Sequence, residues 1–195
     1  MGTPTIVLLA AGSSSRMRGR DKMLEEVAGT PLLSLMAGRA AKADVPVRVV
    51  LGPGQDARRA TLSDLAVEIV AATGTDGMAA SIRAGVAGLT TPVLLMLADM
   101  PGITARDIYQ LVSLHARAPG AILRAATADG RPGHPVLFPA DLVADLGRLR
   151  GDDGAKTLIA REHGRLHLLP LEDDRARLDL DTPEDWARWR GTGAP

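Results

Sequence analysis

Residues Thr5–Ala10 (TIVLLA) form a short apolar run, and residues Ala11–Met17 (AGSSSRM) follow it without a break. The unbroken apolar character of the first segment predicts a strand buried on both faces, as in a parallel sheet. In an open α/β sheet, ligands bind beyond the carboxyl ends of the strands, which places the second segment where phosphates would bind. Its small residues let backbone N–H groups approach an anion, its serines add hydroxyl donors, and Arg16 adds a fork of donors. This junction predicts an α/β fold with an anion-binding loop after the first strand.

The rest of the chain alternates short apolar runs with longer amphipathic stretches, which is typical of βαβ units. We expect a Rossmann-like three-layer sandwich with a mostly parallel sheet and helices on both faces. No linker, internal repeat or low-complexity stretch divides the chain apart from a short C-terminal tail, so we expect residues 1–195 to form a single domain. The predicted strands are Thr5–Ala10, Val47–Leu51, Val67–Ala71, Pro92–Ala98, Ala121–Ala126, Val136–Phe138 and Leu166–Pro170, one of them possibly antiparallel.

Three helix starts can be read from capping residues. Thr30 is a candidate cap with Pro31 at the first helical position, and Thr104 with Asp107 resembles a capping box. Thr182 precedes a proline and two acidic residues, Glu184 and Asp185, which the helix macrodipole favours in the first turn. Further helices are expected over Gly77–Gly88, Leu142–Leu149 and Ala155–His163.

Composition excludes several classes of function. The chain has 23 Lys and Arg against 23 Asp and Glu, and aromatic residues make up 2%, which argues against a nucleic-acid-binding surface. With no cysteine, thiolate nucleophiles, iron–sulfur clusters and disulfides are excluded. No cationic leader or apolar stretch of about 20 residues is present, so we expect a cytoplasmic protein that does not interact with membranes.

The loop after the first strand fits neither of two common phosphate-binding motifs. A P-loop needs Gly-Lys-Ser/Thr, whereas Gly19 is followed by Arg20 and Asp21. A dinucleotide fingerprint needs two more glycines where Ser14 and Met17 stand. Gly52–Ala57 does fit G-x-G-x-x-A, but it follows a later strand and contains a proline, so we interpret it as a tight strand-to-helix turn.

The motifs of this region resemble those of a known superfamily. Leu9–Met17, Asp21–Leu24 and Gly29–Leu33 are similar to the signature of the MobA-like nucleotidyltransferases, L-A-A-G-x-S-x-R-M, a lysine and G-x-P-L-L. The resemblance runs the whole length of the chain and is greatest to the molybdenum cofactor cytidylyltransferases, the MocA-like branch. Its further segments are Gly77–Ile82, Leu97–Pro101, Gly133–Pro135, Gly151–Ala155 and Asp179–Asp185. The resemblance implies a fold of the nucleotide-diphospho-sugar transferase type.

Two acidic positions are candidate ligands for Mg²⁺, with Mn²⁺ as an alternative. Asp99 ends the most apolar strand, and a hard cation prefers carboxylate oxygens together with substrate phosphates. Its other interpretation is a turn or cap residue, but the resemblance implies a metal ligand. The resemblance also favours Asp181 as the second ligand; Asp179 lies two residues earlier, and spacing alone does not choose between them.

The resemblance implies the transfer of CMP from CTP to the phosphate of molybdopterin, with release of pyrophosphate. Positioning and charge neutralisation dominate such a reaction. Arg16, Lys22 and Asp99 are the implied catalytic residues. The implied nucleotide-binding residues are Ala10, Ala11, Gly12, Ser13, Ser14, Ser15, Arg16, Lys22, Gly77 and Ser81. The guanylyl branch carries glycine where this chain has Ala11, which favours cytosine.

The acceptor side is implied at Gly133, His134, Pro135 and Gly154. For His134, a structural role in the turn is an equal alternative. The other histidines, His115, His163 and His167, lack metal-ligand spacing, and we expect them on the surface.

Two other functions stay open at this point. One is a related transferase that acts on GTP or on a sugar or polyol phosphate. The other is a module that binds and delivers molybdopterin dinucleotide without turnover. In any of these roles, transient docking to a molybdoenzyme is a further expectation.

Overall fold

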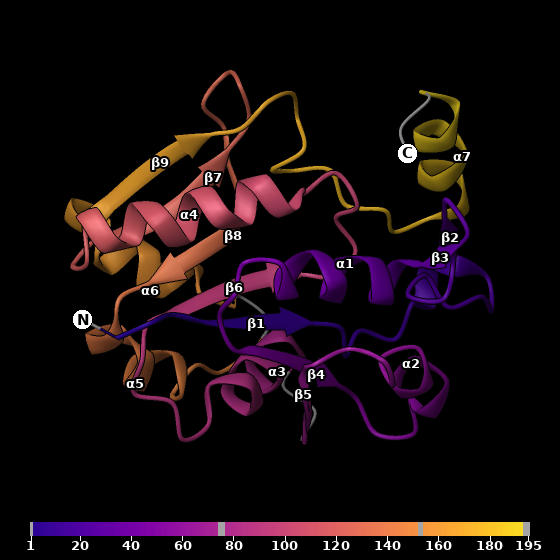
Figure 1. Ribbon diagram of the computed structural model, residues 1–195, viewed down its shortest axis with the longest axis horizontal. Helices are drawn as coiled ribbons and strands as arrows, with labels where there is room; N and C mark the ends of the chain where they lie inside the picture. Colours follow the sequence, from indigo (N-terminus) through magenta and orange to yellow (C-terminus); the bar gives the residue numbers. More distant parts are fainter. Residues whose placement is uncertain (1, 74–76, 152–153, 193–195) are drawn as a thin grey trace.

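The computed structural model describes residues 2–73, 77–151 and 154–192 (Figure 1). Within these residues, seven strands form one sheet in the order β5-β4-β1-β6-β8-β7-β9. β8 runs antiparallel to β6 and β7, and the other neighbouring strands are parallel. The strands are β1 (Thr5–Leu9), β4 (Val47–Leu51), β5 (Glu68–Ala71), β6 (Val93–Leu97), β7 (Ile122–Ala126), β8 (Pro132–Phe138) and β9 (Leu166–Pro170). The mostly parallel sheet with one antiparallel strand is therefore confirmed.

Helices cover both faces of this sheet (Figure 1). They are α1 (Leu32–Ala41), α2 (Asp56–Ala60), α3 (Gly77–Val86), α4 (Ala105–Arg117), α5 (Val143–Leu146), α6 (Lys156–Arg161) and α7 (Pro183–Gly191). Apolar side chains of α1, α4 and α7 form one buried cluster with one face of the sheet. Those of α3, α5 and α6 form a second cluster with the opposite face. The two clusters lie between the sheet and the helices on each of its faces, as expected for the predicted three-layer sandwich.

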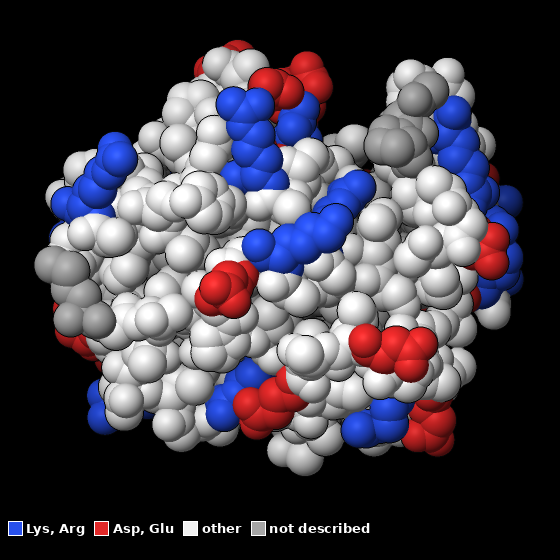
Figure 2. Space-filling model, viewed as in Figure 1, with Lys and Arg blue, Asp and Glu red and all other residues white. Residues whose placement is uncertain are grey.

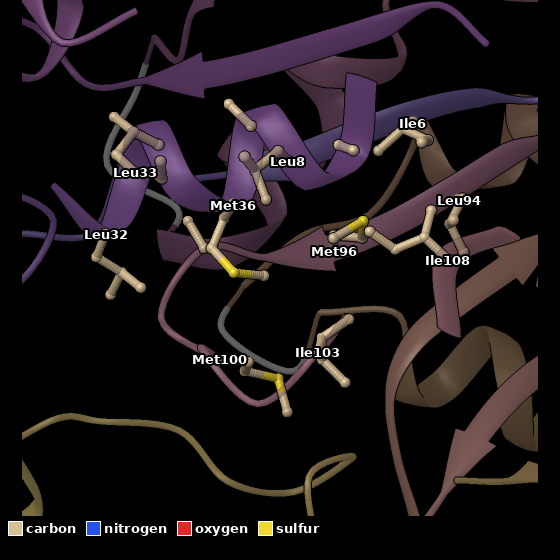
Figure 3. Packing of buried hydrophobic residues seen from close by; sticks show 14 of the residues in the cluster. Ile6, Leu8, Leu32, Leu33, Met36, Leu94, Met96, Met100, Ile103 and Ile108 are labelled. Carbon is tan, nitrogen blue, oxygen red and sulfur yellow. The ribbon is translucent and has the colours of Figure 1, made fainter. Parts of the chain in front are cut away.

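Alternation along the strands separates these two clusters. On β1, Ile6 and Leu8 belong to the first cluster and Val7 to the second, because successive side chains of a strand point to opposite faces. Figure 3 shows the first cluster, with Met36 of α1 and Met96 of β6 among its buried side chains. Both methionines are fully buried, and their flexible chains suit irregular space between helix and sheet.

Two of the predicted helix starts are confirmed and one is wrong. Thr104 and Thr182 each form a complete capping box, with Asp107 and Asp185 respectively. Thr30 does not cap α1. It pairs with Val27 in the two-residue antiparallel strands β2 (Glu26–Val27) and β3 (Thr30–Pro31), so its backbone is extended and the helix begins at Leu32.

Three further expectations need correction. β8 begins at Pro132, four residues before the expected strand Val136–Phe138, since β7 and β8 pair along this segment. The expected Leu142–Leu149 helix is reduced to a 3-10 turn followed by the short α5. His115 is 4% exposed, because it stands four residues after Leu111 on the face of α4 that packs on the sheet. Burial lowers the pKa of His115.

On the face shown in Figure 2, basic and acidic side chains are interspersed, with no broad area of one sign. Many acidic and basic side chains of the described residues form ion pairs, such as Arg165 with Asp141. In the described part of the chain, no helix is both long and apolar enough to cross a membrane.

Helix α3 approaches the sheet closely at Gly85, which gives a stability prediction. A Cβ at this position would lie 2.3 Å from Val7 Cγ1 and 2.9 Å from Val50 Cγ2. We expect Gly85→Ala to lower the free energy of unfolding by about 1–3 kcal/mol, the usual cost of overpacking, although alanine is the better helix former.

The matched control is Gly38→Ala in α1, where nothing lies within 4 Å of the added Cβ. It should be neutral or stabilise the protein by up to about 1 kcal/mol. Urea denaturation of both variants measures the difference. Equal stability of the two variants would contradict close packing at Gly85.

Candidate functional site

A cleft of about 470 Å³ opens at the carboxyl ends of the parallel strands β1, β4, β5 and β6. Ligands of open α/β sheets bind at this edge, because the loops there converge and leave a crevice. The start of α3 closes one side of the cleft. Its lining comprises Leu9, Ala10, Ala11, Gly12, Ser13, Lys22, Met23, Gly52, Pro53, Ala72, Gly77, Met78, Ala80, Ser81, Leu97 and Asp99.

The loop after β1 forms the floor of the cleft with small residues. Gly12 and Ser13 are exposed, and nothing lies within 4 Å of the position that a Cβ on Gly12 would occupy. Ser14 adopts a left-handed conformation (φ 53°) before the short 3-10 helix Ser15–Met17. The loop therefore leaves room beside its backbone for a ligand.

A buried arginine fixes this loop from behind. Arg58 of α2 is 2% exposed and forms two hydrogen bonds with the Asp21 carboxylate, at 2.7 and 2.8 Å. It also donates to the carbonyl of Ala10 and, at 3.0 Å, to the Ser14 hydroxyl. The Ser14 hydroxyl in turn accepts from the backbone N–H of Lys22 at 3.2 Å. One guanidinium thus ties α2 to both the small-residue loop and the lysine segment.

These bonds change the ionisation of Asp21. Burial by itself would raise its pKa, but the hydrogen bonds and charge of Arg58 and the backbone N–H of Met23 outweigh it, and the pKa of Asp21 is lowered. The carboxylate is therefore charged and firmly held at neutral pH.

Lys22 lies at the centre of the site. Its ammonium group donates to Asp99 Oδ2 at 2.5 Å and to Asp181 Oδ1 at 2.6 Å, and its side chain is 10% exposed. Burial opposes the charged form, but the two carboxylates prevail and raise the pKa of Lys22. Residues from three distant parts of the chain therefore meet at one charged group.

Arg16 lies at the solvent side of the same cluster. Its guanidinium pairs with the other oxygen of Asp181, and its side chain is 69% exposed. Asp181 directly precedes the capping box of α7, so a stable helix start fixes its backbone. Arg16 is accordingly an exposed charge at the solvent side, whereas the ion pairs of Lys22 with Asp99 and Asp181 are more buried.

The loop after β6 fixes Asp99. The backbone N–H of Leu180 donates to the Asp99 carbonyl at 3.0 Å, which joins this loop to the segment that carries Asp181. Arg39 of α1 donates to the carbonyls of Pro101 and Ile103 at 2.6 and 2.8 Å. Asp99 is thus held by contacts on both sides of its loop.

The carboxylates near Lys22 provide some, but not all, of the ligands that a divalent cation needs. Asp99 Oδ1 is buried without a hydrogen-bond partner, as an oxygen reserved for a ligand would be. Partial burial, and then the carboxylates of Asp99 and Asp181, raise the pKa of Asp179, so its negative charge is disfavoured there. Across the described ranges, no group of three or more His, Cys, Asp or Glu residues forms a preformed metal site. The donor set fits a cation such as Mg²⁺ that takes one or two carboxylates and completes its shell with phosphates.

A second, smaller pocket of about 140 Å³ shares Leu9 and Met78 with the cleft. His134 and Arg124 line it, together with apolar residues of β6, β8, α3 and α6. The start of β8, just before His134, is tightly packed: a Cβ on Gly133 would lie 1.8 Å from the Ala176 carbonyl oxygen.

Of the acceptor-side residues predicted from the sequence, His134 lines this pocket, whereas Gly133, Pro135 and Gly154 are not among its lining residues. The backbone N–H of His134 donates to Ala176 at 2.7 Å, and Pro135 follows on β8. Gly154 is buried, with φ +56°, and a Cβ there would lie 2.9 Å from Met78 Sδ. Asp152 and Asp153 lie outside the described residues.

Most of the predicted nucleotide-binding residues line the cleft, namely Ala10, Ala11, Gly12, Ser13, Lys22, Gly77 and Ser81. Ser14, Ser15 and Arg16 are not among the lining residues, and the Ser14 hydroxyl is engaged by Asp21 and Arg58. The tight turn predicted at Gly52 and Pro53 is present, and the Gln55 side chain accepts a hydrogen bond from the Gly52 N–H at 2.7 Å. This turn also lines the cleft.

Sequence reasoning missed Arg58, Asp21 and Arg124. No local pattern identifies Arg58, which stands beside Arg59 in a short helix, and only the fold buries one and exposes the other. Asp21 precedes Lys22 and could have been noticed as an acid within a basic segment.

The pair of Arg58 and Asp21 gives a prediction with a defined pH dependence. Removing one partner of a buried pair leaves an uncompensated charge, so Asp21→Asn should cost about 3 kcal/mol of stability at pH 7. Because the folded pKa of Asp21 is lowered, its stabilisation is present above the ordinary value of 3.8 and is lost as the pH falls through the lowered value. The difference between wild type and variant should therefore shrink in acid.

Urea denaturation at pH 7 and at pH 3 measures this. Asp64→Asn, at an exposed aspartate after α2, is the matched control and should change little at either pH. A deficit of Asp21→Asn that does not depend on pH would refute the charged pair as its cause.

The chain is similar to several known proteins. The MobA-like NTP transferase domain matches residues 6–166. A molybdenum cofactor guanylyltransferase of Rhodopseudomonas palustris is 32% identical over 200 residues, which cover 96% of this chain and 91% of that protein. A bifunctional protein GlmU of Cutibacterium acnes is 30% identical over 177 residues, or 86% of this chain, but the match spans only 42% of that longer protein.

Solved structures agree with the sequence matches. The crystal structure of Rv0371c from Mycobacterium tuberculosis has a TM-score of 0.83 and 28% identity, covering 95% of this chain and 97% of that one. A complex of the same protein with manganese has a TM-score of 0.80 and covers 96% and 97%. The described fold is shared with Rv0371c. The match to the family model over residues 6–166 shows that this chain belongs to the MobA-like NTP transferase family.

Proposed function

We propose that this nucleotidyltransferase transfers a nucleotide from a nucleoside triphosphate to the phosphate of molybdopterin, with release of pyrophosphate. The observation that carries the proposal is the Lys22 ammonium group, held between Asp99 and Asp181 at the cleft formed by the small-residue loop. The molybdenum cofactor guanylyltransferase that matches almost the full chain supports molybdopterin as the acceptor.

The triphosphate would lie along the loop after β1. Backbone N–H groups of Gly12 and Ser13 can face it, because the loop has no bulky side chain on this side. Lys22 supplies a point charge from the floor, and Arg16 supplies a fork of donors from the solvent side. Together they neutralise the charge that develops on the α-phosphate and the leaving pyrophosphate.

The reaction needs little covalent work from the protein. An oxygen of the acceptor phosphate attacks the α-phosphorus, the new P–O bond forms, and the bond to the β-phosphate oxygen breaks as pyrophosphate leaves. The attacking phosphate is already ionised at neutral pH, so no general base is required of the chain. Positioning and charge neutralisation therefore account for the catalysis.

Asp99 and Asp181 are the residues that would hold a Mg²⁺ or Mn²⁺ ion. Such a cation, when bound, neutralises phosphate charge and orients the triphosphate. The manganese complex of the M. tuberculosis relative supports a divalent ion. Lys22 contacts one oxygen of each of these carboxylates, so the same acids that would hold the cation also hold the lysine beside the phosphates.

Guanosine and cytidine are the two candidate bases. The R. palustris relative favours GTP, whereas Ala11, at a position where the guanylyl branch carries glycine, favours CTP. No aromatic side chain lines the cleft among the described residues, so backbone groups and small side chains near Gly52, Gly77 and Ser81 would read the base.

The first prediction concerns turnover. Asp99→Asn and Lys22→Met should each reduce pyrophosphate release by about 10²–10³-fold, the usual effect of removing one electrostatic group from such a site. Circular dichroism and urea denaturation check that the variants fold.

Asp64→Asn and Lys42→Met are the matched controls, because both residues are exposed and away from the cleft. A folded Asp99→Asn variant with near-normal transfer would refute the role of Asp99. Nucleotide binding without any turnover by the wild type, in the presence of molybdopterin and Mg²⁺, would instead indicate a delivery module.

The second prediction concerns the nucleotide. A ligand at 100 times its Kd stabilises a protein by about 2.7 kcal/mol, which corresponds to a rise in Tm of roughly 5–11 °C for a chain of this length. We expect GTP with Mg²⁺ to give a larger rise than CTP, ATP or UTP. A larger rise with CTP would assign cytidine as the base. Ala11→Gly should then reduce the difference between the Tm shifts given by CTP and GTP. Equal shifts with all four nucleotides would contradict base selection in this cleft.

A further inference from the structure

The smaller pocket beside the cleft contains cationic and neutral polar groups but no acid among its lining residues. Its walls are apolar, with Leu95 of β6 and Phe138 of β8 on one side and Ile159 of α6 on another. The polar groups are Arg124, His134 and Lys156. Such a lining suits a flat ring system that carries a negative charge.

Arg124 of β7 is half-buried and lacks an acidic partner. Its Nε donates to the Gly133 carbonyl at 2.9 Å, but no carboxylate pairs with it in the described part of the chain. Burial, and then the nearby charge of Arg177, lower the pKa of Arg124, so its surroundings do not stabilise its charge. By contrast, the more deeply buried Arg58 is paired with Asp21. A partly desolvated guanidinium without an anion is costly, and it retains two NH₂ groups for a ligand.

His134 adds a second unmatched group. Its Nδ1 is buried without a hydrogen-bond partner. Burial, followed by the charge of Arg124, lowers the pKa of His134 to about 4, so its ring is neutral at physiological pH. A neutral imidazole still carries one N–H donor. Arg124 and His134 thus line the same pocket, and the Arg124 NH₂ groups and His134 Nδ1 have no hydrogen-bond partner within the described chain.

We propose that Arg124, with His134 and Lys156, forms an anion subsite for a second negatively charged group of the acceptor, distinct from the phosphate that reacts. This inference rests on the proposed function and deepens it. Leu9 and Met78 line both the pocket and the cleft, so the two are neighbours, and an acceptor that reaches from one to the other would place its phosphate near Asp99 and its flat body between the apolar walls. In molybdopterin, the sulfur atoms attached to the ring system are such a negatively charged group. Specificity for the acceptor is then set at Arg124, and specificity for the nucleotide in the main cleft.

The test replaces the charge of Arg124 and measures binding separately from turnover. Hydrogen bonds to charged groups contribute about 1.5–3 kcal/mol, which corresponds to roughly 10- to 100-fold in affinity. Arg124→Gln should therefore raise both the KM for molybdopterin and its Kd, measured by anoxic equilibrium dialysis without nucleotide, by about 10- to 100-fold. The Kd for the nucleotide and kcat at saturating acceptor should stay within about twofold.

Two variants separate charge from a structural effect. Arg124→Lys keeps the charge and should recover part of the lost affinity. Arg117→Gln removes one exposed arginine at the end of α4, outside the pocket, and should behave as wild type. An unchanged Kd and KM in Arg124→Gln would overturn the anion subsite.

The same measurements distinguish failure of the subsite from failure of the proposed function. If wild type binds molybdopterin but transfers no nucleotide to it, the transferase function on this acceptor is wrong, and the dialysis still decides the role of Arg124. If transfer is normal and Arg124→Gln binds as wild type, the function stands and the subsite is wrong. If wild type does not bind molybdopterin, both are overturned.

Discussion

The ammonium group of Lys22 is the interaction on which the arrangement of the cleft depends. It joins the loop after β1, through its own segment, to Asp99 after β6 and to Asp181 before α7. Two carboxylates this close would repel each other without a cation between them, and the shared lysine removes that repulsion. In the proposed function, the site would receive a highly charged nucleotide and a divalent ion, and this lysine balances the two acids before either is present.

Two arginines make this centre rigid from outside the cleft. Arg58 holds the loop after β1 and the lysine segment, and Arg39 holds the loop that follows Asp99. Arg58 lies on α2, which follows strand β4, and Arg39 lies on α1, which follows the hairpin of β2 and β3. Positioning accounts for most of the catalysis in phosphoryl transfer, so groups that restrain loops matter as much as groups that touch phosphate. By contrast, the exposed Arg16 pairs only with Asp181 among the described residues, and the half-buried Arg124 donates to the Gly133 carbonyl without an acidic partner there.

Local signals predicted the parts of the fold that local physics controls. The strands were found because each is an apolar run bounded by turns, and the capping boxes at Thr104 and Thr182 were found because cap and acid stand three residues apart. Thr30 is followed by a proline but has no acid three residues later, and it pairs with Val27 in a local hairpin instead of capping α1. His115 was misplaced because a histidine on a buried helix face looks like any other polar residue in the sequence. The acids and the lysine of the cleft were recognised by resemblance, and their convergence is a property of the fold.

The sequence by itself determined the layer architecture, the loop that ends the first strand and the family, since these depend on periodicity and on motifs of neighbouring residues. Only the tertiary structure decided which charged groups face one another. It paired Arg58 with Asp21 across 37 positions and Lys22 with Asp181 across 159, and it left Arg124 without an acid among the described residues. The physical reason is that burial and partnership are set by the packing of whole elements, which gives two adjacent residues such as Arg58 and Arg59 opposite environments.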